Sequence, residues 1–198
     1  AALGPLKRVG RNIVIADNTT HNSSEHAFYP ALMDVTITGN NIRTDEPTIC
    51  TGDMIKIRSR NVTCTGNIVS NYPSCITVSE PSLNVIIAGN TCLSTGPETG
   101  GGVIDINSES LKSYIDNRPW FSPGGTPDYQ PMSNISITGN SVVMPDFAVS
   151  AVSGRQIKHV AFRVYTGLFN AAFPNGQVQG VSINGNTVKG YNVGFYMN

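Results

Sequence analysis

The chain repeats one six-residue pattern, and this repeat constrains its fold more than any other feature. Two apolar residues alternate with polar ones and lead into Gly-Asn, as in Val35–Asn40 (VTITGN) and Ile135–Asn140 (ISITGN). The recurring Asn residues are 22, 27, 23, 50 and 46 residues apart, so each of the last two intervals holds a unit plus an insertion. Such a period predicts a solenoid, a propeller or an array. The units end at Asn18, Asn40, Asn67, Asn90, Asn140 and Asn186.

Within each unit the alternation is typical of a strand with one buried face. A second alternating strand follows at Met54–Ser59, Cys75–Glu80 and Val103–Ser108, and less clearly at Phe147–Ser153. No unit contains an amphipathic segment of helical length, which excludes helical repeats, and a propeller blade would be longer. The sequence therefore predicts an all-β fold, a parallel β-helix solenoid with coils of about 22–27 residues, as a single domain over residues 1–198.

Stacking of the coils would place equal positions of neighbouring units about 4.8 Å apart, in columns. At each corner, Gly supplies a backbone conformation that other residues resist, and Asn tolerates the left-handed conformation. Stacked Asn side chains can also hydrogen-bond up the column, so we interpret the Gly-Asn pair as scaffold rather than as a site. Two buried aliphatic columns are predicted: Val35, Val62, Val85, Ile135 and Val181, and Ile37, Cys64, Ile87, Ile137 and Ile183.

Composition and the cysteines narrow the class of protein. Thirteen basic residues balance thirteen acidic ones, which predicts no nucleic-acid partner, and no apolar run reaches the length of a membrane span, which predicts no membrane insertion. The cysteines Cys50, Cys64, Cys75 and Cys92 form no CxxC pair and have no His at zinc spacing, so we predict no metal and no cofactor. Cys64 and Cys92 occupy predicted core positions, which favours folding in a reducing compartment.

Two insertions interrupt the repeat, at 109–131 and 154–180. The first holds the only Trp, and loops on rigid scaffolds often carry function. Its aromatic rings could stack on sugars while its charged side chains bind hydroxyls; packing against the solenoid or a neighbouring subunit is the alternative. In the second, Val160–Tyr165 alternates and could be an extra strand. The candidate substrate-binding residues of the first insertion are Asp116, Arg118, Trp120, Asp128 and Tyr129.

The second strand of each unit aligns polar residues in outward columns: Lys56, Thr77 and Asp105; Arg58, Ser79 and Asn107; and Asp53, Ser74 and Gly102. A polar face of this length suits a chain-like substrate, so Lys56, Arg58 and Asn107 are further candidate binding residues. The distances between residues one strand apart and two strands apart bracket the separations of the two catalytic carboxylates in glycosidases. The candidate catalytic acids near this face are Asp105, Glu80 and Glu109, with solvated carboxylates as the alternative. The loop HNSSEH, with His21 and His26, is interpreted as solvated.

These units, each followed by a strand of the form gIxI, resemble right-handed parallel β-helix repeats of the pectin-lyase-like superfamily, over Asn12–Asn198 apart from the insertions. Low charge, coils rich in Ser, Thr and Asn, and buried Cys make the chain most similar to bacteriophage tailspike depolymerases. The resemblance implies a homotrimer of the virion tail that folds in the bacterial cytoplasm and contacts the host cell surface. Neither the paired Asp pattern of polygalacturonases nor the calcium-binding Asp cluster and Arg of pectate lyases is found.

The predicted function is therefore binding and hydrolysis of a bacterial surface polysaccharide, as a glycoside hydrolase. A non-catalytic adhesin or trimeric fibre segment is one alternative, and a polysaccharide lyase with Lys56 or Arg58 as base is another. A secreted protein is the alternative to the virion. The N-terminal residues lack an apolar signal-peptide core, and the chain reads as a fragment of a longer one. The last strand, within Tyr191–Asn198, is expected to be covered by a partner chain or a further domain.

Overall fold

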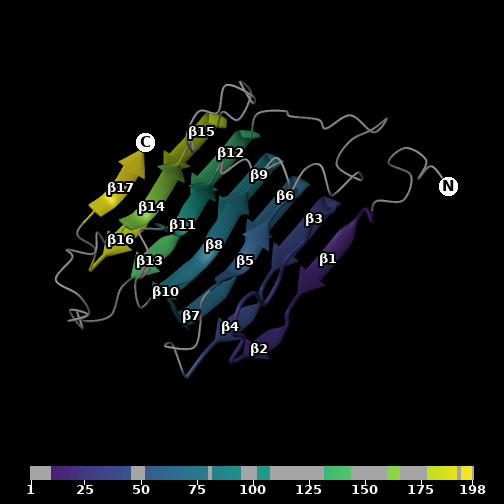
Figure 1. Ribbon diagram of the computed structural model, residues 1–198, viewed down its shortest axis with the longest axis horizontal. Helices are drawn as coiled ribbons and strands as arrows, with labels where there is room; N and C mark the ends of the chain where they lie inside the picture. The colour runs from purple at the N-terminus through teal and green to yellow at the C-terminus, as the bar shows by residue number, and fades with distance from the viewer. Residues whose placement is uncertain are drawn as a thin grey trace.

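The structure is a computed structural model that describes residues 10–45, 52–79, 82–94, 102–107, 132–143, 160–165, 178–190 and 193–197. Throughout these ranges the regular elements are β-strands, β1 to β17, and they form three parallel sheets (Figure 1). The same residues contain no helix that is long and apolar enough to cross a membrane. The predicted all-β class is therefore confirmed.

Each repeat contributes one strand to sheets A and B, and every repeat but the first contributes one strand to sheet C. Sheet A has the order β1 (Ile13–Ala16), β3 (Met33–Thr38), β6 (Arg60–Thr65), β9 (Leu83–Ala88), β12 (Met132–Thr138) and β15 (Val178–Asn184). Sheet B has the order β2 (Thr19–His21), β4 (Asn41–Arg43), β7 (Ile68–Tyr72), β10 (Thr91–Ser94), β13 (Ser141–Val143) and β16 (Thr187–Lys189). Sheet C has the order β5 (Asp53–Ile57), β8 (Ser74–Ser79), β11 (Gly102–Asn107), β14 (Val160–Tyr165) and β17 (Val193–Met197). This order is compatible with a parallel β-helix.

The pairing register confirms both predicted aliphatic columns. Val35 pairs with Val62, and each further member of that column lies opposite the next; the column that begins at Ile37 behaves in the same way. The central members of both columns are at most 1% exposed. After the corner, Val69 is fully buried whereas Ile68 is 44% exposed, so Val69 takes the core position beside Ile42.

Sheet C includes the extra strand predicted from the alternation at Val160–Tyr165 and one further segment that the sequence did not identify. Strand β14, which the sequence places inside the second insertion, pairs directly with β11, whereas Phe147–Ser153 lies outside the described residues. In the first repeat, Phe28 forms a parallel bridge to Ile55, and Lys56 N donates to Phe28 O at 2.9 Å. The segment around Phe28 therefore continues sheet C beyond β5.

An inner ladder of hydrogen-bonded amides joins the Asn residues that follow the corners: Asn18, Asn40, Asn67, Asn90, Asn140 and Asn186. The Nδ2 of each of the first five donates to Oδ1 of the next Asn at 2.8–2.9 Å. The same Oδ1 also accepts from the preceding Asn's backbone N–H. The four central members are at most 1% exposed, so the predicted stacking satisfies buried polar groups.

A second, outer ladder precedes each unit and was not predicted. It consists of Asp34, Asn61, Asn84 and Asn134, with φ between 54° and 56°, and each Asn Nδ2 donates to the preceding member at 2.8–3.0 Å. These contacts are exposed, and their donors point toward the N-terminal end of the stack, opposite to the inner ladder. Gly180 takes the next position of this column, with φ of 61°.

The described cysteines are core residues. Cys64, Cys75 and Cys92 are free and fully buried, as expected for Cys64 and Cys92, while Cys50 lies outside the described residues. Burial raises the pKa of the Cys64 and Cys75 thiols. Both therefore stay protonated at neutral pH and behave as small apolar side chains.

Candidate functional site

The polar columns predicted on the second strands lie in register across sheet C. One column runs from Lys56 through Thr77, Asp105 and Arg163 to Tyr196. Thr77 is 3% exposed and Asp105 is 4% exposed, so the middle of this column is buried rather than solvated. The accessible polar groups of the face lie toward β5, where Lys56 keeps 22% of its side chain exposed.

Asp105 is held by Arg163 of the neighbouring strand. Arg163 Nε donates to Asp105 Oδ1 at 2.9 Å, and the Arg163 Nη2 donates to Oδ2 at 2.5 Å. The two side chains are 6% and 15% exposed. This two-pronged contact, which we call the Arg163 fork, occupies both carboxylate oxygens of Asp105 and fixes their orientation. Asp105 thus pairs two strands, and its catalytic role stays a prediction.

Asp53 forms a second charged group, at the start of β5. Its Oδ2 lies 3.3 Å from Lys56 Nζ, and its Oδ1 accepts from Ser74 Oγ at 2.8 Å. Burial disfavours the charged carboxylate, but the contacts with Thr77, Lys56 and Ser74 outweigh burial and lower the pKa of Asp53. The Thr77 hydroxyl is buried, and its geometry falls short of a hydrogen bond, so Ser74 is the bonded partner. Asp53 is therefore a fixed negative charge beside Lys56.

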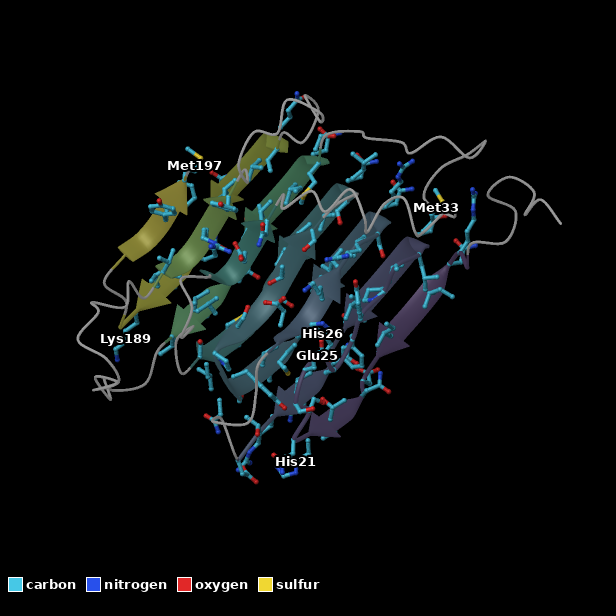
Figure 2. The ribbon with its side chains drawn as sticks, in the orientation of Figure 1. His21, Glu25, His26, Met33, Lys189 and Met197 are labelled. Carbon is cyan, nitrogen blue, oxygen red and sulfur yellow. The ribbon has the colours of Figure 1, made fainter. Side chains whose placement is uncertain are left out.

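The segment beside β5 adds aromatic rings to this end of sheet C. His26 Nδ1 lies 2.7 Å from Asp53 O; because a carbonyl only accepts, Nδ1 carries the proton. Its Nε2 lies 3.7 Å from Glu25 Oε1, and Figure 2 shows these two side chains together. The Tyr29 ring meets the His26 ring edge-on at 5.1 Å, and the Arg58 guanidinium lies 5.6 Å from the Tyr29 centroid.

We call His26, Tyr29, Asp53, Lys56 and Arg58 the β5 cluster. The sequence identified Lys56 and Arg58 but interpreted the loop with His26 as solvated, whereas the His26 side chain is only 15% exposed. The spacing of the repeat gives no fixed position for this segment, because β5, β8 and β11 begin 13, 7 and 12 residues after their own corner Asn residues.

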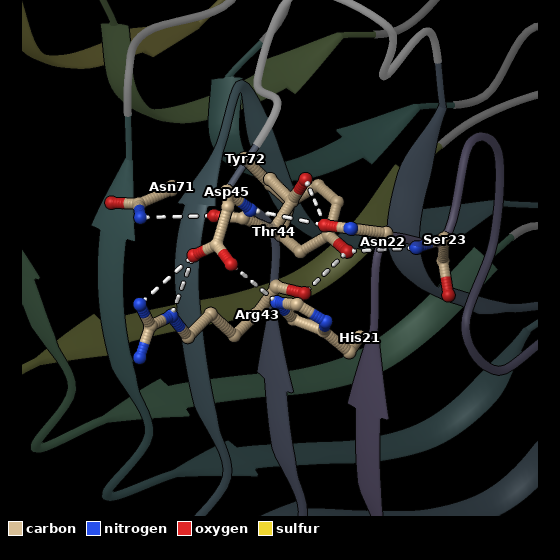
Figure 3. A network of polar contacts seen from close by, with 8 residues as sticks. All are labelled: His21, Asn22, Ser23, Arg43, Thr44, Asp45, Asn71 and Tyr72. Atoms are coloured by element: carbon tan, nitrogen blue, oxygen red, sulfur yellow. Dashed lines mark hydrogen bonds and ion pairs between the residues drawn. The ribbon is translucent and has the colours of Figure 1, made fainter.

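A separate polar network ties the ends of β2, β4 and β7 together (Figure 3). The fully buried Tyr72 donates its hydroxyl to Arg43 O at 3.0 Å and accepts from Ser23 N at 3.1 Å. Asn22 Oδ1 accepts from Thr44 Oγ1 and from Asp45 N, both at 3.0 Å. The first part of the His-containing loop is thereby fixed to the next two repeats, so this network is part of the scaffold.

At the surface of the same network, Asp45 contacts both Arg43 and His21. Its Oδ1 lies 2.8 Å from Arg43 Nη2, and its Oδ2 lies 2.8 Å from His21 Nε2. The hydrogen bond from Arg43 is the main cause that lowers the pKa of Asp45. His21 and Asp45 are each about half exposed, so the pair contributes little to stability.

The described carboxylates of sheet C do not form a pair at glycosidase spacing. Asp53 and Asp105 lie two strands apart and three positions apart in register, which corresponds to about 10 Å in each direction. Inverting enzymes use separations of roughly 6.5–9.5 Å. Across the described ranges, no three His, Cys, Asp or Glu side chains are grouped to hold a metal ion.

Four of the predicted site residues lie on or directly beside sheet C: Lys56, Arg58, Asp105 and Asn107. The others lie outside the described residues: Glu80, Glu109, Asp116, Arg118, Trp120, Asp128 and Tyr129. Comparison of the chain with protein-family models, with curated proteins and with solved structures gave no match.

Proposed function

We propose that this protein is a right-handed parallel β-helix of the pectin-lyase-like kind, similar to tailspikes, that binds a bacterial surface polysaccharide on sheet C. The β5 cluster carries the proposal. It places the Tyr29 ring beside the Arg58 guanidinium, with the Lys56–Asp53 ion pair on β5, at the accessible end of the polar columns. Aromatic faces stack on sugar rings, and charged side chains bind hydroxyls, so this combination suits a carbohydrate.

The length of sheet C fits an extended ligand. From the segment around Phe28 to β17 it spans five inter-strand intervals, which amounts to about 24 Å. A bound chain crossing the strands would meet Lys56 and Arg58 at one end and Tyr165 and Tyr196 at the other. Because Thr77, Ser79 and Asp105 in the middle of this face are at most 6% exposed, the accessible contacts for a glycan lie at its two ends.

Hydrolysis of the bound polysaccharide remains part of the proposal, with Asp105, Glu80 and Glu109 as its candidate acids and a homotrimer of the virion tail as its setting. The spacing of Asp53 and Asp105, and the Arg163 fork on Asp105, favour the second candidate function, a non-catalytic adhesin or fibre segment. The hydrolase and the adhesin would use the same binding face, but only the hydrolase would cleave the bound glycan.

The test measures binding to purified capsular and lipopolysaccharide glycans by calorimetry. We expect Lys56→Gln and Arg58→Gln to weaken binding at least ten-fold, whereas His21→Ala, in the exposed network at the other corner, should leave it unchanged. Equal affinity of the three variants would refute the assignment to the β5 cluster. New reducing ends would identify a hydrolase, an unsaturated ultraviolet-absorbing product a lyase, and neither product an adhesin.

A further inference from the structure

The two ends of the stack of strands carry complementary halves of the inner ladder. Strands β15, β16 and β17 form one edge of the three sheets, and β1 and β2 form the opposite edge of sheets A and B. In Figure 1 these edges lie at opposite sides of the molecule, one in yellow and one in purple. Between them, every repeat bonds to the next by the same set of contacts.

The contacts between two neighbouring interior repeats illustrate this set, and we call their pattern the rule. Gly66 N donates to Ala88 O at 3.2 Å, and Asn67 N donates to Asn90 Oδ1 at 3.0 Å. In return, Thr91 N donates to Asn67 O at 2.8 Å, and Asn90 Nδ2 donates to the carbonyl oxygen of residue 64 at 3.0 Å. The corners at Gly39 and Gly139 repeat the same contacts toward their next repeats.

At the edge formed by β15 and β16, half of this set has no partner among the described residues. Gly185 N and Asn186 N occupy the donor positions of the rule, and Asn186 O occupies an acceptor position, yet none makes the corresponding contact. At the opposite edge, Asn18 Oδ1 and Thr19 N are the missing acceptor and donor. Within the residues that the structure describes, each edge therefore lacks the hydrogen-bonding groups that the other edge presents.

We propose that the β15–β17 edge binds the β1–β2 edge of a second copy of this chain, in parallel and in register. Gly185 N then donates to Ala16 O of the second copy, Asn186 N and Nδ2 donate to its Asn18 Oδ1, and its Thr19 N donates to Asn186 O. The contact continues the inner ladder from one copy into the next and satisfies backbone groups that an open strand edge leaves unpaired.

The side chains at the two edges fit the same register. The rule places Ile183 over Ile15 of the second copy, and Val188 over its Thr20. In sheet C it places Phe195 over Phe28 of the second copy, because both belong to the column of Ile55. Phe195 is 46% exposed, so stacking would remove apolar surface from water.

The contact joins two different surfaces, so it does not close around a two-fold axis, and copies add in rows. It does not involve the outer face of sheet C, and it extends that face from copy to copy. Such a row is distinct from the trimer that the resemblance implies, and it does not depend on the proposed glycan binding.

The test uses one substitution at each edge that should prevent the contact. Val188→Lys places an ammonium group in the apolar column of one edge, where Val188 is 37% exposed in the single chain. Thr19→Pro removes the N–H that would donate across the contact, and proline is tolerated on a sheet edge. Ile86→Lys is the matched control, because Ile86 is 46% exposed in the interior of sheet A.

Sedimentation velocity of the 198-residue chain should show rows that grow with concentration. Each edge variant alone should associate at least ten-fold more weakly, and an equal mixture of the two should give dimers and nothing larger. The control should associate like the unmodified chain, and circular dichroism reports whether each variant is folded.

A chain that stays monomeric at all concentrations would overturn the proposal, as would an oligomer that resists both edge variants. Amide hydrogen exchange decides the question without any variant. Exchange of Gly185 and Asn186 should slow at least ten-fold as the concentration rises, and rates independent of concentration would refute the contact.

Discussion

Replacement of one inner-ladder residue, Asn67→Ala, tests whether the amide ladder stabilises the fold. Asn67 is fully buried; its Nδ2 donates to Asn90 Oδ1 at 2.9 Å and to Ile37 O at 3.0 Å. Its Oδ1 accepts from Asn40 N at 3.1 Å and from Asn40 Nδ2 at 2.8 Å. Alanine cannot make any of these four contacts, and no solvent reaches the groups that lose them.

The cost follows from which groups keep another partner. Asn40 N loses its side-chain acceptor, and Ile37 O loses its side-chain donor. Asn40 Nδ2 still donates to Ile15 O, and Asn90 Oδ1 still accepts from the backbone N–H of residue 67. At about 1–1.5 kcal/mol for each of the four lost bonds, the free energy of unfolding should fall by about 4–6 kcal/mol.

The matched control is Asn84→Gly in the outer ladder. It removes the contacts of Asn84 with Asn61 and Asn134, which are exposed, and glycine adopts the same conformation, as Gly180 does at φ of 61°. We expect a loss of about 1 kcal/mol or less, because water replaces the lost bonds and glycine adds some chain entropy.

Urea unfolding followed by far-ultraviolet circular dichroism, with the m-values compared, measures both variants. Equal losses for Asn67→Ala and Asn84→Gly would contradict the reasoning. A loss below about 2 kcal/mol for Asn67→Ala would also do so, because it would mean that water or a local shift satisfies the orphaned groups.

Three further substitutions test single features of the scaffold. Thr20→Val should raise the free energy of unfolding by about 1 kcal/mol, measured by urea unfolding, because the Thr20 Oγ1 is buried without a partner in the described structure. Gly89→Ala should cost about 1–2 kcal/mol at φ of 62°, and Gly89→Asp should cost less, because Asp17 holds the equivalent corner at φ of 55°. Since the folded pKa of Asp53 is lowered, its stabilisation is present above the ordinary value of 3.8 and is lost as the pH falls through the folded pKa. The deficit of Asp53→Asn at pH 7 should therefore shrink in unfolding measurements at acidic pH.

The core and the inner ladder could be predicted because the spacing of the repeat sets the strand register. Once the corner residues Asn40 and Asn67 are aligned, Val35 must face Val62 and the two amides must stack. The outer ladder has a weaker signal, a polar residue before each unit, filled by Asp34 in one case and by Gly180 in another. Its role depends on a left-handed backbone that composition does not specify.

Burial of the polar columns could not be predicted from the repeat. Register places Asp105 on the outer face of sheet C, but the structure buries it and pairs it with Arg163, 58 residues later and beyond an interrupted stretch of the repeat. The segment near His26 and Tyr29 was missed for a related reason. It is hydrogen-bonded to β5 but forms no regular strand, and residues 26–30 (HAFYP) show no apolar alternation that would mark one.

The Arg163 fork also determines how a catalytic role of Asp105 can be tested. Removal of one partner from a buried ion pair costs about 3–5 kcal/mol, so Asp105→Asn could abolish glycan cleavage merely by destabilising sheet C. The double variant Asp105→Leu with Arg163→Met removes both charges, and such replacements are often close to neutral. If that folded double variant cleaves glycan as the unmodified chain does, Asp105 is structural. If it binds glycan with unchanged affinity and cleaves none, the carboxylate or its partner guanidinium acts in the reaction, and Arg163→Lys separates the two because it keeps a cation beside Asp105.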